Sequence, residues 1–142
     1  ANMATQHILV GFDFSPDGAR ALTWAADLAE ATGATFDIAY VHPGFEVAGP
    51  WPPQEHTERY CRFLAGEVER EAEALLPNAS PKSVNIVLGT DIQESLIAQA
   101  AEAGADLICV GCSGKGLAKR ALVGSVSESL MRRSEVPVLV VR

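Results

Sequence analysis

Residues 106–116 read DLICVGCSGKG, and farther along the chain come GSVSE at 124–128 and VPVLVV at 136–141. The two apolar runs in this third of the chain predict short buried strands. Between them, glycines stand at positions 111, 114, 116 and 124. A buried strand that ends in a glycine-rich loop before a helix is typical of phosphate sites. Glycine lets the backbone approach the ligand, and the first amides of the helix face it.

Any one of these glycines has a plainer interpretation as a turn, because glycine commonly releases a chain from a sheet. Two glycine sites in succession favour a ligand: Gly111 and Gly114 leave the strand, and Gly124 opens the next helix. Ser125 is expected to be the N-cap of that helix, with a hydroxyl that can also donate to a phosphate. Glu128 follows three residues later, so the same serine can belong to a capping box.

The spacing of Gly111, Gly114 and Gly124-Ser125 resembles the nucleotide motif of the universal stress protein family. The segments ILVGFDFS at 8–15 and VPVLVVR at 136–142 fit the same family, so the resemblance covers nearly the whole chain. We interpret residues 1–142 as a single nucleotide-binding domain of this kind. Ala1-Asn2, which precede Met3, look like a remnant of expression.

Strand patterns alternate with helix patterns along the chain. This alternation predicts an α/β fold with a doubly wound, parallel, Rossmann-like α/β/α sandwich of five strands and four helices. The resemblance implies the strand order 3-2-1-4-5, which places Asp13 and Gly111 at the point where the order reverses. His7, which opens the first strand, is expected at the surface or at a sheet edge. The expected strands are 7–11, 36–41, 84–89, 106–110 and 136–141, and the expected helices are 16–32, 54–76, 92–103 and 125–133.

The resemblance also implies how a nucleotide would lie. Asp13 is suited to a ribose or adenine contact, although it can instead cap the following helix. Val41 would meet adenine through its backbone, or else it is only a core residue. Lys115 and Arg120 would screen the phosphates. The implied binding residues are Gly11, Phe12 and Asp13 after the first strand, Val41 after the second, Val110, Gly111 and Gly114 along ribose and phosphate, and Gly124, Ser125, Val126 and Ser127 at the outer phosphates.

The function implied by the resemblance is an ATP-binding regulatory module in stress response. AMP or ADP are alternative ligands, and Mg²⁺ would be held mainly by phosphate oxygens. The sequence has no nucleophile elbow, Walker lysine loop or metal-binding histidine pair, so we expect no catalytic residues and no protein metal site. At most we expect slow ATP hydrolysis, or autophosphorylation on Ser113, Ser125 or Ser127. The alternative is a dimeric stress-related interaction protein of the same fold that binds no nucleotide.

The charge and composition of the chain limit the classes of partner that we expect. The net charge of -7 argues against general nucleic-acid binding. Residues 104–142 nevertheless carry six basic and three acidic residues, a balance that suits an anionic ligand. No apolar run approaches the roughly 20 residues of a membrane helix. Three cysteines without metal-ligand spacing suggest a reducing cytoplasm, with Cys109 as a core residue.

The last strand and the segment 42–53 each suggest a further structural role. The last strand, Val138–Val141, is apolar and would form a sheet edge, which tends to pair or to be covered. Members of the resembled family pair through this strand, so a homodimer is expected. The segment 42–53 is rich in proline and glycine, and a loop of this length is more often a binding lid than filler.

Overall fold

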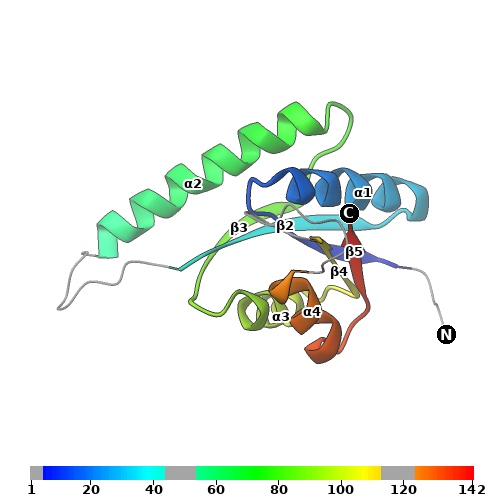
Figure 1. The fold of residues 1–142 in the computed structure, drawn as a ribbon. Helices are drawn as coiled ribbons and strands as arrows, with labels where there is room; N and C mark the ends of the chain where they lie inside the picture. Colours follow the sequence, from blue (N-terminus) through cyan, green and yellow to red (C-terminus); the bar gives the residue numbers. More distant parts are fainter. Residues whose placement is uncertain (1–4, 44–53, 113–123) are drawn as a thin grey trace.

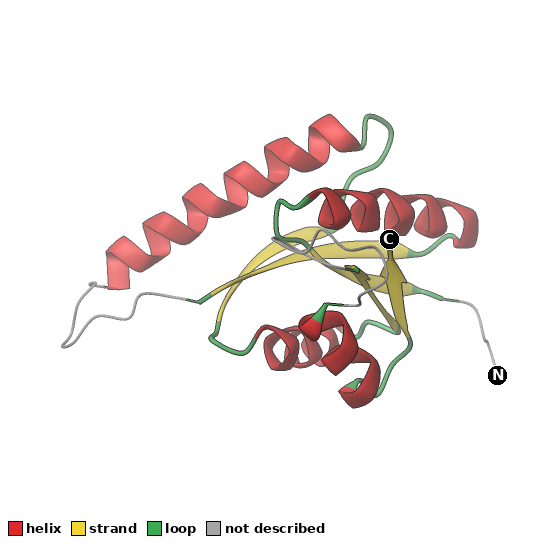
Figure 2. Cartoon of the chain, viewed as in Figure 1, coloured by secondary structure: helices red, strands yellow, loops and turns green. Residues whose placement is uncertain are grey.

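The computed structural model describes residues 5–43, 54–112 and 124–142 of the chain. A five-stranded parallel sheet has the order β3-β2-β1-β4-β5, which confirms the expected topology. Figures 1 and 2 show α1 and α2 on one face of this sheet and α3 and α4 on the other. The elements are β1 His7–Gly11, α1 Pro16–Thr32, β2 Thr35–His42, α2 Gln54–Leu75, β3 Ser83–Leu88, α3 Ile92–Ala103, β4 Leu107–Gly111, α4 Ser125–Arg133 and β5 Val138–Val141.

The helix boundaries follow local capping chemistry. Ser15 caps α1 by accepting a hydrogen bond from the Gly18 amide, with Pro16 at the first helical position. Asp91 caps α3 in the same way through the amide of Glu94. Gly33 and Gly104 end these two helices in the left-handed conformation, at φ 75° and 68°. Such boundaries can be recognised from sequence, because serine and aspartate are favoured at the N-cap and glycine directly after a helix.

The bounds of α4 are the expected ones, but its N-cap residue differs from the expectation. Gly124 is the N-cap, in an extended conformation at φ -64° and ψ 155°, and Ser125 is already the first helical residue. The expected Ser125 cap and its capping box with Glu128 are therefore wrong. The reason lies outside the helix: the Gly124 amide donates to the carbonyl of Cys112 at 2.7 Å, and its carbonyl accepts from Glu128. These bonds hold Gly124, and not Ser125, in the N-cap position.

The segment 42–53 falls mostly in residues that the structure does not describe, so the expected lid stays a prediction. Within the described ranges, no helix combines the length and the apolar character that crossing a membrane requires. Each face of the sheet has its own core. Ile8 and Val10 pack on the α1 and α2 side, and Leu9 packs on the α3 and α4 side, as strand alternation requires.

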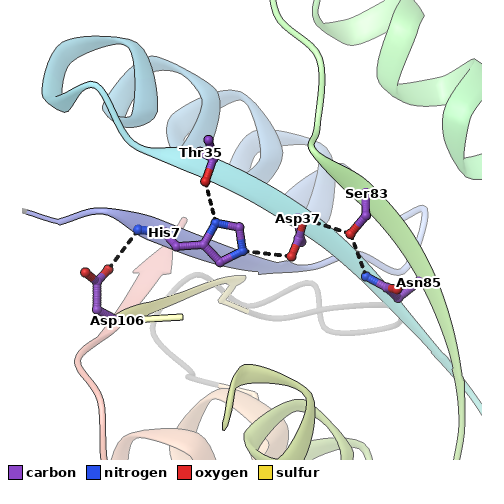
Figure 3. Close-up of polar contacts among 6 residues, drawn as sticks. All are labelled: His7, Thr35, Asp37, Ser83, Asn85 and Asp106. Carbon is purple, nitrogen blue, oxygen red and sulfur yellow. Dashed lines mark hydrogen bonds and ion pairs between the residues drawn. The ribbon is translucent and has the colours of Figure 1, made fainter. Parts of the chain in front are cut away.

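A polar network crosses the amino ends of three strands (Figure 3). His7 is only 9% exposed, and its Nδ1 lies 2.6 Å from the Thr35 hydroxyl. Its Nε2 lies 2.7 Å from Asp37 Oδ2, and the other oxygen of Asp37 accepts from the Ser83 hydroxyl at 2.7 Å. Asn85 in turn donates to that hydroxyl. The expectation of a surface or edge histidine is wrong, because β1 is the central strand and is flanked by β2 and β4.

The hydrogen bonds of this network exclude a Ser-His-Asp catalytic triad. The Ser83 hydroxyl donates to the Asp37 carboxylate and not to the His7 ring. A nucleophilic serine needs the imidazole as its proton acceptor, so these three groups do not form a catalytic triad. On the other side of β1, the Asp106 carboxylate accepts from the backbone amides of Gln6 and His7. The cluster therefore joins the amino ends of β1, β2 and β3 and the residue before β4.

We predict that Asp37→Ala lowers the free energy of unfolding by about 2 to 4 kcal/mol, because it leaves buried partners on His7 and Ser83 unsatisfied. Ser83→Ala should cost about 1 to 2 kcal/mol, since it removes one hydrogen bond to the carboxylate and the acceptor of Asn85. Asp27→Ala, on the exposed face of α1, is the matched control and should change stability by less than about 0.5 kcal/mol. Urea unfolding measures all three, and an Asp37→Ala effect no larger than the control would contradict this role.

Candidate functional site

A cavity of about 630 Å³ opens at the carboxyl edge of the sheet, a size within the range of small-molecule sites. It includes the carboxyl ends of β1 and β4, the neighbouring strands at which the order reverses. Gly114 lies outside the described residues. The ten other predicted binding residues line the cavity: Gly11, Phe12, Asp13, Val41, Val110, Gly111, Gly124, Ser125, Val126 and Ser127.

The cavity lining combines apolar side chains with a helix amino terminus. Val41 of β2 and Ile92 and Leu96 of α3 are apolar lining residues, and Leu96 lies beside Gly11 and Val110 at the ends of β1 and β4. On the β4 side, the wall is the start of α4. Ile92 and Leu96 were not among the residues predicted to bind a ligand. Their signal was the position of the α3 start directly after the β3 strand, which brings the first turn of α3 to the same edge of the sheet.

Asp13 lines the cavity, and its carboxylate accepts hydrogen bonds from a residue of the same loop. Asp13 Oδ1 accepts from the Ser15 amide at 3.0 Å and from the Ser15 hydroxyl at 2.5 Å. Ser15 also lines the cavity, which the sequence did not predict. A Cβ on Gly18 would lie only 2.6 Å from Asp13 Oδ1, so this glycine makes room for the carboxylate. Ser15, and not Asp13, therefore caps α1. Asp13 supports this cap by accepting the hydrogen bond of the Ser15 hydroxyl.

The polar end is built by the amino terminus of α4. The Glu128 amide bonds to the Gly124 carbonyl, so the amides of Ser125, Val126 and Ser127 precede the first turn's hydrogen bonds. Such amides and the helix dipole favour an anion. The Ser127 hydroxyl donates to the carbonyls of Gly111 and Cys112, at 2.8 and 3.0 Å. Its side chain therefore attaches α4 to β4, and only its backbone suits a phosphate.

Gly111 has a packing role that the sequence did not reveal. A Cβ at this position would lie 2.7 Å from the carbonyl carbon of Asp17 and 2.9 Å from its oxygen. Real Cβ atoms essentially never approach backbone so closely. The glycine that was predicted to allow ligand approach is thus already required by the contact between α1 and β4.

The described lining carries little charge. Asp13 is its only acidic residue, and it includes no lysine, arginine or histidine, while Lys115 and Arg120 lie outside the described residues. Burial, followed by the nearby Tyr60 and Asp13, raises the pKa of Tyr40, another lining residue that the sequence analysis did not single out. No cluster of three or more metal-ligating side chains occurs among the described residues.

The cysteines in the described part of the chain are free thiols. Cys109 is fully buried, and burial raises its pKa to about 12, so its thiol stays protonated at neutral pH. It lies in the core, as its place in a strand predicts. Cys112 is also buried and lines the cavity, which its place in the glycine loop did not by itself indicate.

Comparison with protein families matches residues 4–142 to the universal stress protein family. The stress response protein NhaX of Bacillus subtilis is 29% identical, over 95% of this chain and 96% of its own length. A putative universal stress protein of Staphylococcus aureus is 33% identical, over 96% of this chain and 84% of its own. Against a universal stress protein of Mycolicibacterium smegmatis, 29% identical over 97% of this chain, the match spans 49% of the relative's length.

Solved structures agree on the fold. Universal stress protein UspA from Lactobacillus plantarum superimposes with a TM-score of 0.79 at 22% identity, covering 99% of this chain and 100% of that one. A universal stress protein in complex with cAMP has a TM-score of 0.71 at 28% identity, with 98% of both chains covered. The dAMP complex of an Archaeoglobus fulgidus universal stress protein has a TM-score of 0.66 at 20% identity, covering 99% and 100%.

We predict that Gly111→Ala destabilises the protein by about 2 kcal/mol or more, because the added methyl group meets the backbone of Asp17. Gly66→Ala is the matched control: Gly66 lies inside α2 and a Cβ there meets no atom within 4 Å. That change should stabilise the helix by up to about 1 kcal/mol. Urea unfolding of both variants checks the prediction, and equal stability of the two would refute the packing role.

Proposed function

Because the chain belongs to the universal stress protein family, we propose that it is an ATP-binding regulatory module in stress response. One observation carries this proposal. A single cavity is lined both by apolar side chains, among them Val41, Ile92 and Leu96, and by the amino terminus of α4 at Ser125. This pairing suits a ligand with a flat apolar ring at one end and an anionic group at the other.

The strand order suggests the orientation of the ligand. The base would lie at the β2 and α3 end, the ribose beside Gly11 and Asp13 of the central strand region, and the phosphates along Gly111 and Gly124. The backbone of Val41 would contact the base. The family members solved with cAMP and with dAMP support an adenine nucleotide as the class of ligand. AMP or ADP remain alternatives to ATP in this proposal.

Binding without efficient turnover fits the described lining. Asp13 is its one carboxylate, and Ser15 already donates two hydrogen bonds to Asp13 Oδ1. The lining offers a triphosphate main-chain amides and hydroxyls but no basic side chain from the described residues. Mg²⁺ would therefore be held mainly by the phosphate oxygens and would offset their charge. We propose slow ATP hydrolysis or serine phosphorylation as the upper limit of catalysis.

A second function has its own supporting observation. Gly111 is needed because any side chain there would meet the backbone of α1. The Ser127 hydroxyl donates hydrogen bonds to the carbonyls of Gly111 and Cys112. Two of the implied binding residues thus have reasons to be present that need no ligand. The alternative proposal is a dimeric interaction protein with the same fold that binds no nucleotide.

We further propose a cytoplasmic homodimer that pairs through β5, with residues 1–142 as one domain. In β5, the carbonyls of Pro137 and Val141 bond to the Ile108 and Cys112 amides of the β4 segment. In a parallel ladder the backbone groups of Val138 and Val140 then point to the open edge. The free cysteines support a reducing compartment.

For nucleotide binding, we predict micromolar affinity for ATP by calorimetry, strengthened by Mg²⁺. Gly124→Val should abolish it, because the valine side chain would stand at the N-cap of α4, where the phosphates approach. The φ of -64° at Gly124 is open to valine, so the fold should survive. Gly66→Val is the matched control and should bind normally, because that position faces open space far from the cavity lining. Absence of binding by nucleotide-stripped wild type would favour the second function.

For the dimer, we predict that sedimentation velocity at micromolar concentration gives twice the mass of one chain. Val140→Pro should shift the protein toward monomer, since it removes an amide on the open edge and leaves the β4 ladder intact. A circular dichroism melt checks that the variant folds. Only monomer for the wild type across the concentration range would rule out pairing through β5.

A further inference from the structure

Two large apolar side chains are exposed on the helices that flank the edge strand β5. Trp24 of α1 is 59% exposed, and Met131 of α4 is 50% exposed. The two helices lie on opposite faces of the sheet, and both pack against β5 (Figure 1). Single exposed apolar side chains are ordinary, but several around one feature mark an interaction site. The direction in which each side chain points therefore decides whether the two belong to one surface.

Trp24 points toward the β5 side of α1. Asp17 lies directly against Gly111 of β4, and Trp24, seven residues later, is on the same side of the helix. Leu22 and Ala26, two residues before and after Trp24, are buried in the core that α1 shares with α2. Because residues two apart on a helix do not share a face, Trp24 lies on the side away from α2. Beyond β4 on that side comes β5, the edge of the sheet.

Met131 points toward the same edge from the other face. The Arg133 guanidinium lies 3.9 Å from the carboxylate of Asp91, the N-cap residue of α3, so that side of α4 faces α3. Met131 comes two residues before Arg133 and therefore lies on the side of α4 away from α3. Since α3 packs against β1, β2 and β3 while α4 packs against β5, the side away from α3 is the outer edge of the sheet.

The strand between these two side chains is apolar on both faces. Leu139 packs on the α1 side of the sheet, Val138 and Val140 pack on the α4 side, and all three are half-buried. None of the four residues of β5 is charged, although charged side chains are a common means of blocking an open strand edge. Trp24 thus shares a face with Leu139, and Met131 shares the other face with the two valines.

A second copy of this chain is the partner that fits such a surface. An edge strand of four residues offers hydrogen bonds but little area, whereas a stable interface buries about 800 Å² on each partner. A buried tryptophan side chain adds about 150–250 Å². If two β5 strands pair antiparallel, the two-fold axis is perpendicular to the sheet, so each face meets the same face of the other copy. Trp24 would then lie along the junction on one face and Met131 on the other.

We propose that Trp24 and Met131 anchor the homodimer, by burying their side chains against the second copy on the two faces of the joined sheet. This inference rests on the proposed pairing through β5 and assigns the side chains that give the pairing its affinity. The hydrogen bonds of the strands set the register of the two copies. Tryptophan is among the residues that most often dominate the binding energy of an interface.

Sedimentation equilibrium measures the dissociation constant of the dimer for the wild type and three variants. Trp24→Ala should raise this constant about 30-fold or more, and Met131→Ala should raise it about fivefold. Phe63→Ala is the matched control, because Phe63 is 57% exposed on α2, and it should leave the constant unchanged. Alanine is the best helix former, so the substituted helices should persist, and circular dichroism checks that they do.

Fluorescence tests the burial of Trp24 directly. Trp51→Phe removes the other tryptophan of the chain, so that the emission reports Trp24 alone. The emission should move to shorter wavelength as the protein concentration passes through the dissociation constant, because the ring leaves water. When Val140→Pro is added to this variant, the shift should disappear over the same concentration range, since the pairing of β5 is disrupted.

The outcomes separate the anchors from the dimer itself. A wild-type protein that stays monomeric at every concentration would reject the homodimer and, with it, the anchors. A dimer with an unchanged dissociation constant in Trp24→Ala and a constant Trp24 emission would overturn the anchor role and leave strand pairing in place. Equal weakening by Phe63→Ala would place the interface on α2 and would also overturn the proposal.

Discussion

The contact between Gly111 and the first turn of α1 is the constraint on which this site depends. Because Gly111 has no side chain, the backbone of Asp17 can rest directly on the end of β4. The carbonyl of the same glycine accepts from Ser127, which places the start of α4. Two helices on opposite faces of the sheet are thus positioned from one residue, and the cavity is the space that remains between them and β2.

Much of the fold follows from local chemistry that a sequence displays. Ser15, Asp91, Gly33 and Gly104 act within their own helices, and apolar alternation acts within each strand. These features need no knowledge of distant neighbours. Ten of the predicted binding residues line the cavity. They could be predicted because the family resemblance implies both these residues and the strand order, which the individual strand patterns do not contain.

The failures share one physical cause, which is dependence on another element. His7 is buried because β1 lies between β2 and β4, and its own neighbours in sequence do not reveal this. The start of α4 is set by the Cys112 carbonyl and not by the better capping residue, Ser125. Gly111 has the same explanation, since a glycine gives no sign of the helix that will approach it.

The strand order also has a consequence for synthesis. The central strand β1 cannot pair with β4 until about 100 further residues have been made, as the hydrogen bond from the Gln6 amide to Asp106 illustrates, because it spans 100 residues. While the chain leaves the ribosome, β1, β2 and β3 can pair first, with one long side of β1 uncovered. Such an exposed edge is the kind of surface that aggregates or attracts chaperones. The step that covers this edge of β1 is therefore the arrival of β4, about 100 residues after β1.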